Sequence, residues 1–137
     1  MESLTTLFDL VFARRRLAAR VDEALGVHHG LALGDLGLLL ELRDAGGRMR
    51  RTDLASRLGI TASGVARQVA PLERIGLVGR EPGRDARVAL VTLTETGSRV
   101  AGEALVTGRE AAAEALAAVW APREQERLGD LLRKARV

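Results

Sequence analysis

The chain has 137 residues, of which 47% are hydrophobic and 28% are charged, a balance that predicts one domain with a sizeable buried core. Cysteine is absent and only His28 and His29 supply imidazole, which excludes disulfides, thiolate metal sites and cysteine nucleophiles. Aromatic residues make up 2%, too few for the stacking surfaces of single-stranded nucleic-acid binders. No apolar stretch spans a bilayer and the start does not resemble a signal peptide, so we expect a cytoplasmic protein with no membrane partner.

The formal net charge of +3 is unevenly distributed along the chain. Residues 48–87 carry nine basic and four acidic side chains, whereas residues 1–47 carry five and seven, and residues 88–137 carry seven of each. A basic segment in an otherwise neutral chain is typical of a surface that meets phosphate. An ordinary solvated face remains an alternative on charge alone.

The N-terminal part is predicted to be helical. Apolar residues recur at three- and four-residue steps over residues 4–25, which predicts an amphipathic helix of about five turns. A shorter helix is predicted over residues 35–44, ended by two glycines, Gly46 and Gly47. The next residues, 48–50, are too few for more than a stub of strand.

The middle of the chain carries a helix-turn-helix pattern. We expect a short helix over residues 51–58, a turn at Gly59, an N-cap at Thr61 and a second helix over residues 62–75. Ala55, Gly59 and Val65 have the spacing of such units, because the helices cross closely at the alanine and the tight turn needs a positive φ. Pro71 inside the second helix predicts a bend or a reset last turn.

A hairpin is predicted directly after this unit. Two short strands, over residues 78–81 and 87–93, flank a glycine-containing turn at residues 82–86. A helix-turn-helix followed by a basic hairpin is a winged helix. Its tip offers Arg84 and Arg87, and arginine on a projecting tip suits the narrow, negative minor groove of DNA. An ordinary exposed turn pair of Asp85 and Arg87, worth under about 1 kcal/mol, is the alternative.

Two further helices are predicted at the C-terminal end. Thr94 is a plausible N-cap for a helix to about residue 119, and Pro122 fits the first turn of a last helix. The terminal helices present more apolar surface than the middle segment covers, and small alanine side chains allow close helix packing, so we favour an intertwined dimer. High helix propensity alone is the alternative reason for the alanines.

Three stretches of sequence are similar to those of one known family. They are Thr52-Asp53-Leu54-Ala55-x-x-Leu58-Gly59-Ile60, Ser63-Gly64-Val65-Ala66-Arg67-Gln68-Val69 with Leu72-Glu73-x-x-Gly76-Leu77-Val78, and Gly83-Arg84-Asp85-x-Arg87 running into Leu93-Thr94-x-x-Gly97. In these the chain resembles the MarR family of bacterial transcriptional regulators, over nearly its whole length. The resemblance implies a homodimer held by terminal helices and a winged helix that binds palindromic duplex DNA, usually as a repressor released by a small ligand.

We therefore expect an α+β fold, mainly α with a small β-hairpin, in one domain over residues 1–137. The winged helix-turn-helix DNA-binding region is expected over residues 33–93, and the dimerisation helices over residues 1–30 and 94–137.

The expected DNA contacts come from the second helix and the wing. Spacing places Val65, Val69 and Leu72 on the core side of the helix. Arg67 is the best base reader, because arginine bonds guanine O6 and N7 together in the major groove, and Ser63 suits a phosphate. The resemblance implies that Arg87 enters the minor groove and that Asp85 holds a neighbouring arginine. The predicted set is Arg50, Arg51, Thr61, Ala62, Ser63, Ala66, Arg67, Arg84, Asp85 and Arg87.

Catalysis is not expected. The two histidines are adjacent and point different ways, and the chain has neither a P-loop nor a dinucleotide-binding glycine motif, so we predict no enzyme, no cofactor and no metal. A regulatory anion is conceivable where the dimer helices meet the winged helix, at Arg14, Arg15, Arg16 and His28, although solvation is the simpler role of the arginine run. The alternative function is a winged-helix protein-interaction module that has lost DNA reading, which the alanines at positions 62, 66 and 70 keep open.

Overall fold

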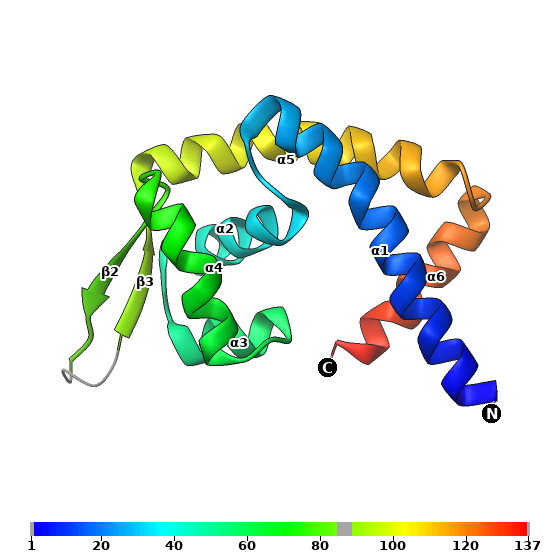
Figure 1. Ribbon diagram of the computed structural model, residues 1–137, viewed down its shortest axis with the longest axis horizontal. Coiled ribbons are helices and arrows are strands. Elements are labelled where there is room, and N and C mark those ends of the chain that lie inside the picture. Colours follow the sequence, from blue (N-terminus) through cyan, green and yellow to red (C-terminus); the bar gives the residue numbers. More distant parts are fainter. Residues whose placement is uncertain (1, 85–88, 137) are drawn as a thin grey trace. The chain divides into compact units, whose positions relative to one another are not determined.

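The computed structural model describes residues 2–84 and 89–136. Within them the chain is mainly helical with one small antiparallel sheet, as predicted (Figure 1). The elements are α1 (Glu2–His29), α2 (Leu33–Asp44), β1 (Arg48–Arg50), α3 (Arg51–Leu58), α4 (Ala62–Arg74), β2 (Val78–Pro82), β3 (Ala89–Leu93), α5 (Glu95–Ala117) and α6 (Pro122–Ala135). The chain divides into two compact units. The central unit comprises Gly34–Leu105 and the terminal unit comprises the chain on either side of it, so α5 contributes to both.

The turn between α3 and α4 has the predicted geometry. Gly59 is in the left-handed region with φ 69°, and the N–H of Ile60 donates to the carbonyl of Ala55 at 3.1 Å. Thr61 caps α4, since its Oγ1 accepts from the N–H of Gly64 at 2.9 Å. This cap satisfies one of the free N–H groups at the helix start and holds α4 at a fixed entry point.

Helix α4 does not stop at its internal proline. Pro71 lacks the N–H that donates to the carbonyl of Arg67 in a regular helix, yet the helix continues to Arg74. It ends at a left-handed glycine, Gly76 with φ 81°, and the N–H of Leu77 bonds back to the carbonyl of Leu72 at 3.0 Å. The chain then enters β2 beside the end of α4.

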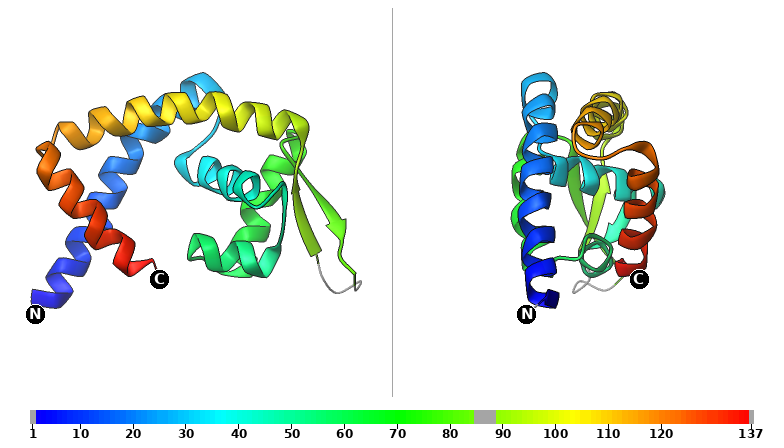
Figure 2. Two further views of the ribbon diagram at one scale, coloured as in Figure 1. Left: turned by 180° about the vertical axis from the view of Figure 1, so that it is seen from behind. Right: turned by 90° about the vertical axis from the view of Figure 1, so that its right-hand side faces the viewer.

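The sheet has the order β1-β3-β2, with both pairings antiparallel. The three-residue β1 is a true edge strand, and its Met49 is opposite Val91 of β3. On the other side of β3, Val78 is opposite Leu93 and Pro82 is opposite Ala89. Figure 2 shows β2 and β3 as a two-stranded ribbon next to α4. The helices and the sheet enclose a core of Leu36, Leu38, Leu39, Leu42, Leu54, Val65, Val69, Leu72, Leu77, Val78 and Val91.

The start of α5 is fastened to the turn between α4 and β2. Thr94 caps the helix as predicted, because its Oγ1 accepts from the N–H of Gly97 at 2.9 Å. The same hydroxyl donates to the carbonyl of Gly76 at 2.7 Å. A Cβ at Gly97 would lie 2.0 Å from the carbonyl oxygen of Leu77, so only glycine fits there.

The terminal unit contains α1, the second part of α5 and α6. Val21, Leu25 and Ala115 are buried, and His29 Nε2 lies 2.8 Å from Thr107 Oγ1, which joins the end of α1 to α5. Helix α6 turns back from the end of α5, with Pro122 in its first turn as predicted (Figures 1 and 2).

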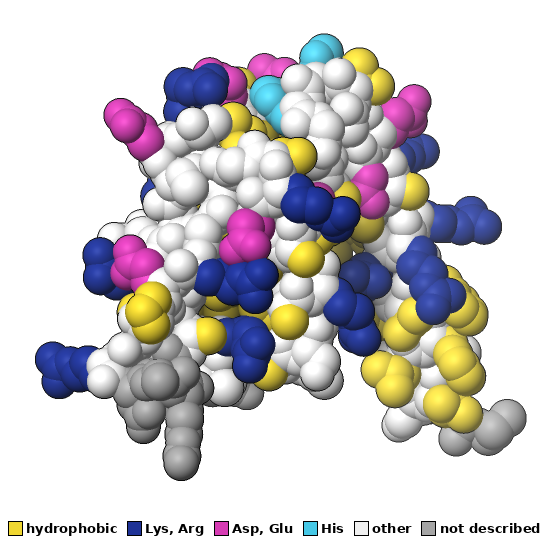
Figure 3. Space-filling view, turned by 60° about the vertical axis from the view of Figure 1, so that its left-hand side comes forward, with side chains coloured by type: hydrophobic (Ala, Val, Ile, Leu, Met, Phe, Trp, Pro, Cys, Tyr) yellow, Lys and Arg dark blue, Asp and Glu magenta, His cyan; other side chains and the backbone are white. Residues whose placement is uncertain are grey.

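Large apolar side chains remain exposed on the terminal helices. Figure 3 shows hydrophobic side chains gathered where α1 begins, at the lower right. Those exposed on α1 and α6 include Leu4, Leu7, Phe8, Leu10, Phe12, Leu131 and Leu132, with exposed fractions of 40% to 57%. None of the helices in residues 2–84 and 89–136 has the length and apolar character needed to cross a membrane.

Candidate nucleic-acid interface

Helix α4 has one buried and one exposed face. Val65, Val69 and Leu72 are at most 3% exposed and pack into the core, which confirms the predicted inner face. Ser63, Ala66 and Arg67 are exposed, whereas Ala62 and Ala70 are half-buried. Because the buried residues fix the rotation of the helix about its axis, the exposed face is available for a partner.

Four of the arginines predicted to contact DNA are exposed and form no ion pair with any residue in the described ranges. They are Arg50 and Arg51 at the junction of β1 and α3, Arg67 on α4, and Arg84 just beyond β2. Others are paired: Arg48 lies 3.5 Å from Glu81, and Arg57 lies 3.6 Å from Glu41 of α2. The unit thus keeps several cationic side chains open to phosphate.

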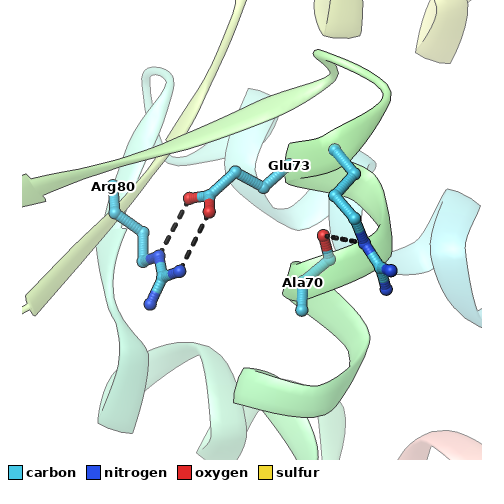
Figure 4. Close-up of polar contacts among 4 residues, drawn as sticks. Ala70, Glu73 and Arg80 are labelled. Carbon is cyan, nitrogen blue, oxygen red and sulfur yellow. Dashed lines mark hydrogen bonds and ion pairs between the residues drawn. The ribbon is translucent and has the colours of Figure 1, made fainter.

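One strong ion pair joins α4 to β2 (Figure 4). The guanidinium of Arg80 donates from Nε to Glu73 Oε2 at 2.8 Å and from Nη2 to Glu73 Oε1 at 2.9 Å. These hydrogen bonds lower the pKa of the Glu73 carboxyl and raise the pKa of the Arg80 guanidinium. Among the residues that the structure describes, the neighbouring Arg74 donates only to the carbonyl of Ala70 of its own helix, at 3.4 Å.

Comparison with known proteins shows what the chain is similar to. A family model described as winged helix-turn-helix DNA-binding matches residues 35–78. The structure is also similar to that of a MarR family transcriptional regulator from Streptomyces coelicolor in complex with DNA, with 29% identity, a TM-score of 0.84, and coverage of 98% of this chain and 85% of that one. In its fold and its winged helix-turn-helix, the chain is similar to MarR family transcriptional regulators.

Other solved structures of transcriptional regulators extend the comparison. The transcriptional regulator BldR from Sulfolobus solfataricus is 27% identical with a TM-score of 0.79, covering 97% of this chain and 96% of that one. A mutant MarR from Escherichia coli, solved with operator DNA, is 21% identical with a TM-score of 0.82, covering 97% and 95%, and shows the shared fold alone. No curated protein sequence matches the chain significantly.

The predicted DNA-contacting residues that the structure describes fall in three places of the central unit. Arg50 and Arg51 lie between β1 and α3, Thr61 to Arg67 lie at the start of α4, and Arg84 lies in the hairpin. The Thr61 hydroxyl is already engaged in capping α4. Asp85 and Arg87, predicted for the wing, lie outside the described residues.

Sequence reasoning did not find a role for the pair of Glu73 and Arg80. The two residues are seven positions apart and meet because the chain reverses direction at Gly76. The available signal was opposite charges on either side of a glycine that follows a helix.

The predicted ligand residues are only partly brought together. A pocket of about 390 Å³ lies between α1 and α5 of the terminal unit, lined by Arg20, Glu23, Ala24, Val27, His28, Ala111, Glu114 and Ala115. His28 lines it, whereas Arg14, Arg15 and Arg16 do not, and Arg15 lies over the ring of Phe12 at 5.9 Å. Within the described residues, no group of three or more potential ligands is arranged to hold a metal ion.

Proposed function

We propose that the protein is a sequence-specific regulator of transcription that binds duplex DNA as a homodimer, acts as a repressor and is released by a small ligand. The observation that carries the proposal is the two-faced helix α4: its inner face is locked in the core and its outer face presents Ser63, Ala66 and Arg67. This arrangement fits a recognition helix in the major groove, with the hairpin as a wing. The DNA complex of the 29% identical relative supports it.

The proposed contacts are with base edges, with phosphates and with the minor groove. Arg67 has the planar donors for the O6 and N7 of guanine, and Ser63 in the first turn suits a phosphate near the helix N-terminus. Arg50, Arg51 and Arg84 supply charge to the backbone, a role that needs exposure and no bound carboxylate. We assign Asp85 and Arg87 to the wing and place Arg87 in the minor groove. Short side chains at Ala62 and Ala66 leave room for close approach to base edges.

Binding to DNA is tested by titrating the protein into a labelled duplex taken from upstream of its own gene. The proposal predicts a complex that survives an excess of random duplex and resists salt better than the complex with random DNA. Equal affinity for both duplexes, or no binding, contradicts the proposal and favours a winged-helix module that binds protein.

We propose that the apolar side chains of the terminal helices pack against a second copy of the chain. Seven large apolar side chains of α1 and α6 are 40% to 57% exposed, and gathered apolar side chains of this kind mark association surfaces. Two-fold pairing of these helices buries them and places two recognition helices about one turn of DNA apart, on a pseudo-palindromic operator.

Sedimentation of variants altered in the terminal helices tests this interface. Changing both Phe8 and Phe12 to glutamate, or deleting residues 121–137, is expected to convert a dimer to a monomer at micromolar concentration. The control is Ile75→Glu, which adds the same kind of charge to a side chain that is 59% exposed at the end of α4. A dimer that persists in the two terminal-helix variants contradicts the assignment.

The pocket at His28 is the proposed place for a regulatory ligand. It contains cationic Arg20 and anionic Glu23 and Glu114 beside apolar alanine and valine side chains, which suits a small molecule with an apolar body and a polar group. A ligand there is expected to lower DNA affinity in the titration above, and His28→Ala should abolish that response without changing DNA affinity alone.

A further inference from the structure

The side chains that meet DNA in the proposed function lie on two separate elements. Arg67 is on α4, and Arg84 follows β2. Arg67 can meet base edges while Arg84 meets the DNA backbone only if the angle between α4 and β2 is right. That angle therefore affects DNA affinity even though it involves no contact with DNA.

The joint between α4 and β2 is a short turn. It contains Gly76 at φ 81° and the hydrogen bond from the N–H of Leu77 to the carbonyl of Leu72. Glycine tolerates a wide range of backbone angles, and Pro71 removes one hydrogen bond between the last turn of α4 and the part that carries Arg67. Pro71 thus weakens α4 ahead of the joint, while the turn itself is held by Thr94, whose Oγ1 donates to the carbonyl of Gly76 at 2.7 Å.

The pair of Glu73 and Arg80 crosses this joint. Two nearly parallel hydrogen bonds, at 2.8 and 2.9 Å, fix direction as well as distance, since a guanidinium fork meets a carboxylate in one plane. Arg80 is 60% exposed and Glu73 is 34% exposed, so the pair lies at the surface of the winged helix and is held by its own geometry.

If the charge of Glu73 were all that mattered, removing it should strengthen DNA binding. A carboxylate on a unit that binds phosphate repels DNA, so its removal should strengthen binding if it had no other role. Glu73 engages two of the five N–H groups of Arg80, at Nε and Nη2, so only its remaining N–H groups could meet a phosphate while the pair is intact.

We propose that Glu73 and Arg80 are a positioning pair, which holds the recognition helix and the wing at the angle that lets both engage DNA. This inference rests on the proposed function. It assigns DNA-binding roles to two residues that need not touch DNA.

The deciding experiment compares Glu73→Gln with Glu81→Gln. Both substitutions remove one negative charge, but Glu81 contacts Arg48 through one longer approach of 3.5 Å between strands. Glu73→Gln should weaken binding to the specific duplex about two- to fivefold, the range expected for loss of an exposed ion pair. Glu81→Gln should leave affinity unchanged or strengthen it. Equal or tighter binding by Glu73→Gln overturns the proposal.

A second comparison keeps all charges. Arg80→Lys preserves the positive charge but loses the fork, and it should weaken specific binding, whereas Arg74→Lys should have no effect. Equal affinities of Arg80→Lys and the wild type overturn the positioning role, because lysine serves a direct phosphate contact well. Thermal unfolding followed by circular dichroism establishes that each variant is folded under the binding conditions.

A double-substitution cycle separates positioning from a general structural role. In an Arg84→Ala background the wing has lost a contact, so Glu73→Gln should cost less affinity than in the wild type. Additive losses overturn the proposal. If the wild type does not prefer the specific duplex, the proposed function itself is contradicted. If the wild type binds specifically and the Glu73→Gln variant binds with the same affinity, only this inference is contradicted.

Discussion

At the scale of single residues, a few positions determine the helix-turn-helix. Gly59 occupies a left-handed conformation that side chains with a Cβ disfavour, and Thr61 caps the helix that follows. Both roles are local, depending on residues within a few positions in the sequence. For this reason both could be predicted before the structure was known.

Replacing Gly59 by alanine should lower the free energy of unfolding by about 1 kcal/mol, because a Cβ is strained at φ 69°. The matched control is Gly37→Ala inside α2, where φ is not positive and a Cβ meets no atom within 4 Å, so stability should rise by about 0.5–1 kcal/mol. Urea denaturation of both variants measures the difference. Equal effects of the two substitutions are incompatible with the turn geometry.

The Glu73 carboxyl should make stability depend on pH. Its pKa is lowered in the folded protein by the hydrogen bonds from Arg80, so the stabilisation is present above the ordinary carboxyl pKa and is lost as the pH falls through the lowered one. The difference in unfolding free energy between the wild type and Glu73→Gln should therefore shrink on acidification below about pH 4.5. In an Arg80→Gln background the same comparison should show little dependence on pH, and a dependence that persists there is evidence against the pairing.

At the scale of elements, the sequence predicted most of the helices because their apolar spacing and end signals agree. The prediction for α1 ended at residue 25, the last position of the apolar repeat, whereas the helix runs to His29. Its true end signal is Gly30, with φ 67° and a bond from the N–H of Leu31 to the carbonyl of Leu25.

Contacts between elements could not be predicted in the same way. The approach of α5 to the turn before β2 joins Gly97 to Leu77, and the pair of Glu73 and Arg80 joins α4 to β2. Each depends on how the chain reverses direction, which apolar periodicity does not encode. Of the candidate site, the outer face of α4 followed from helical spacing alone.

The junction at Gly97 gives a sharp test of the packing between α5 and the winged helix. Gly97→Ala places a Cβ 2.0 Å from the carbonyl oxygen of Leu77, so backbone must shift, and we expect a loss of about 1–3 kcal/mol in unfolding free energy. Gly102→Ala, on the same helix, meets only the end of Arg43 at 3.8 Å and should stabilise the protein slightly. Comparable thermal midpoints for the two variants would show that the junction is looser than described.

At the scale of the whole molecule, charge and apolar surface are separated along the chain. The basic residues concentrate in the segment that forms the winged helix, while the exposed apolar side chains concentrate on α1 and α6. This separation supports two roles for one chain, DNA binding by the central unit and self-association by the terminal helices. The net charge of +3 for the whole chain does not by itself indicate DNA binding, because the terminal unit does not share the basic excess of the central one.

The central claim is that the protein reads DNA sequence through α4, and competition binding of wild type and Arg67→Ala across single-base variants of the operator tests it most directly. Loss of Arg67 should remove about 1–3 kcal/mol of discrimination at one base position in each half-site while affinity for random DNA falls less. Arg87→Ala serves as the comparison, since a minor-groove arginine should weaken binding to specific and random DNA together. If Arg67→Ala lowers affinity equally for every sequence, α4 is not the element that reads the bases.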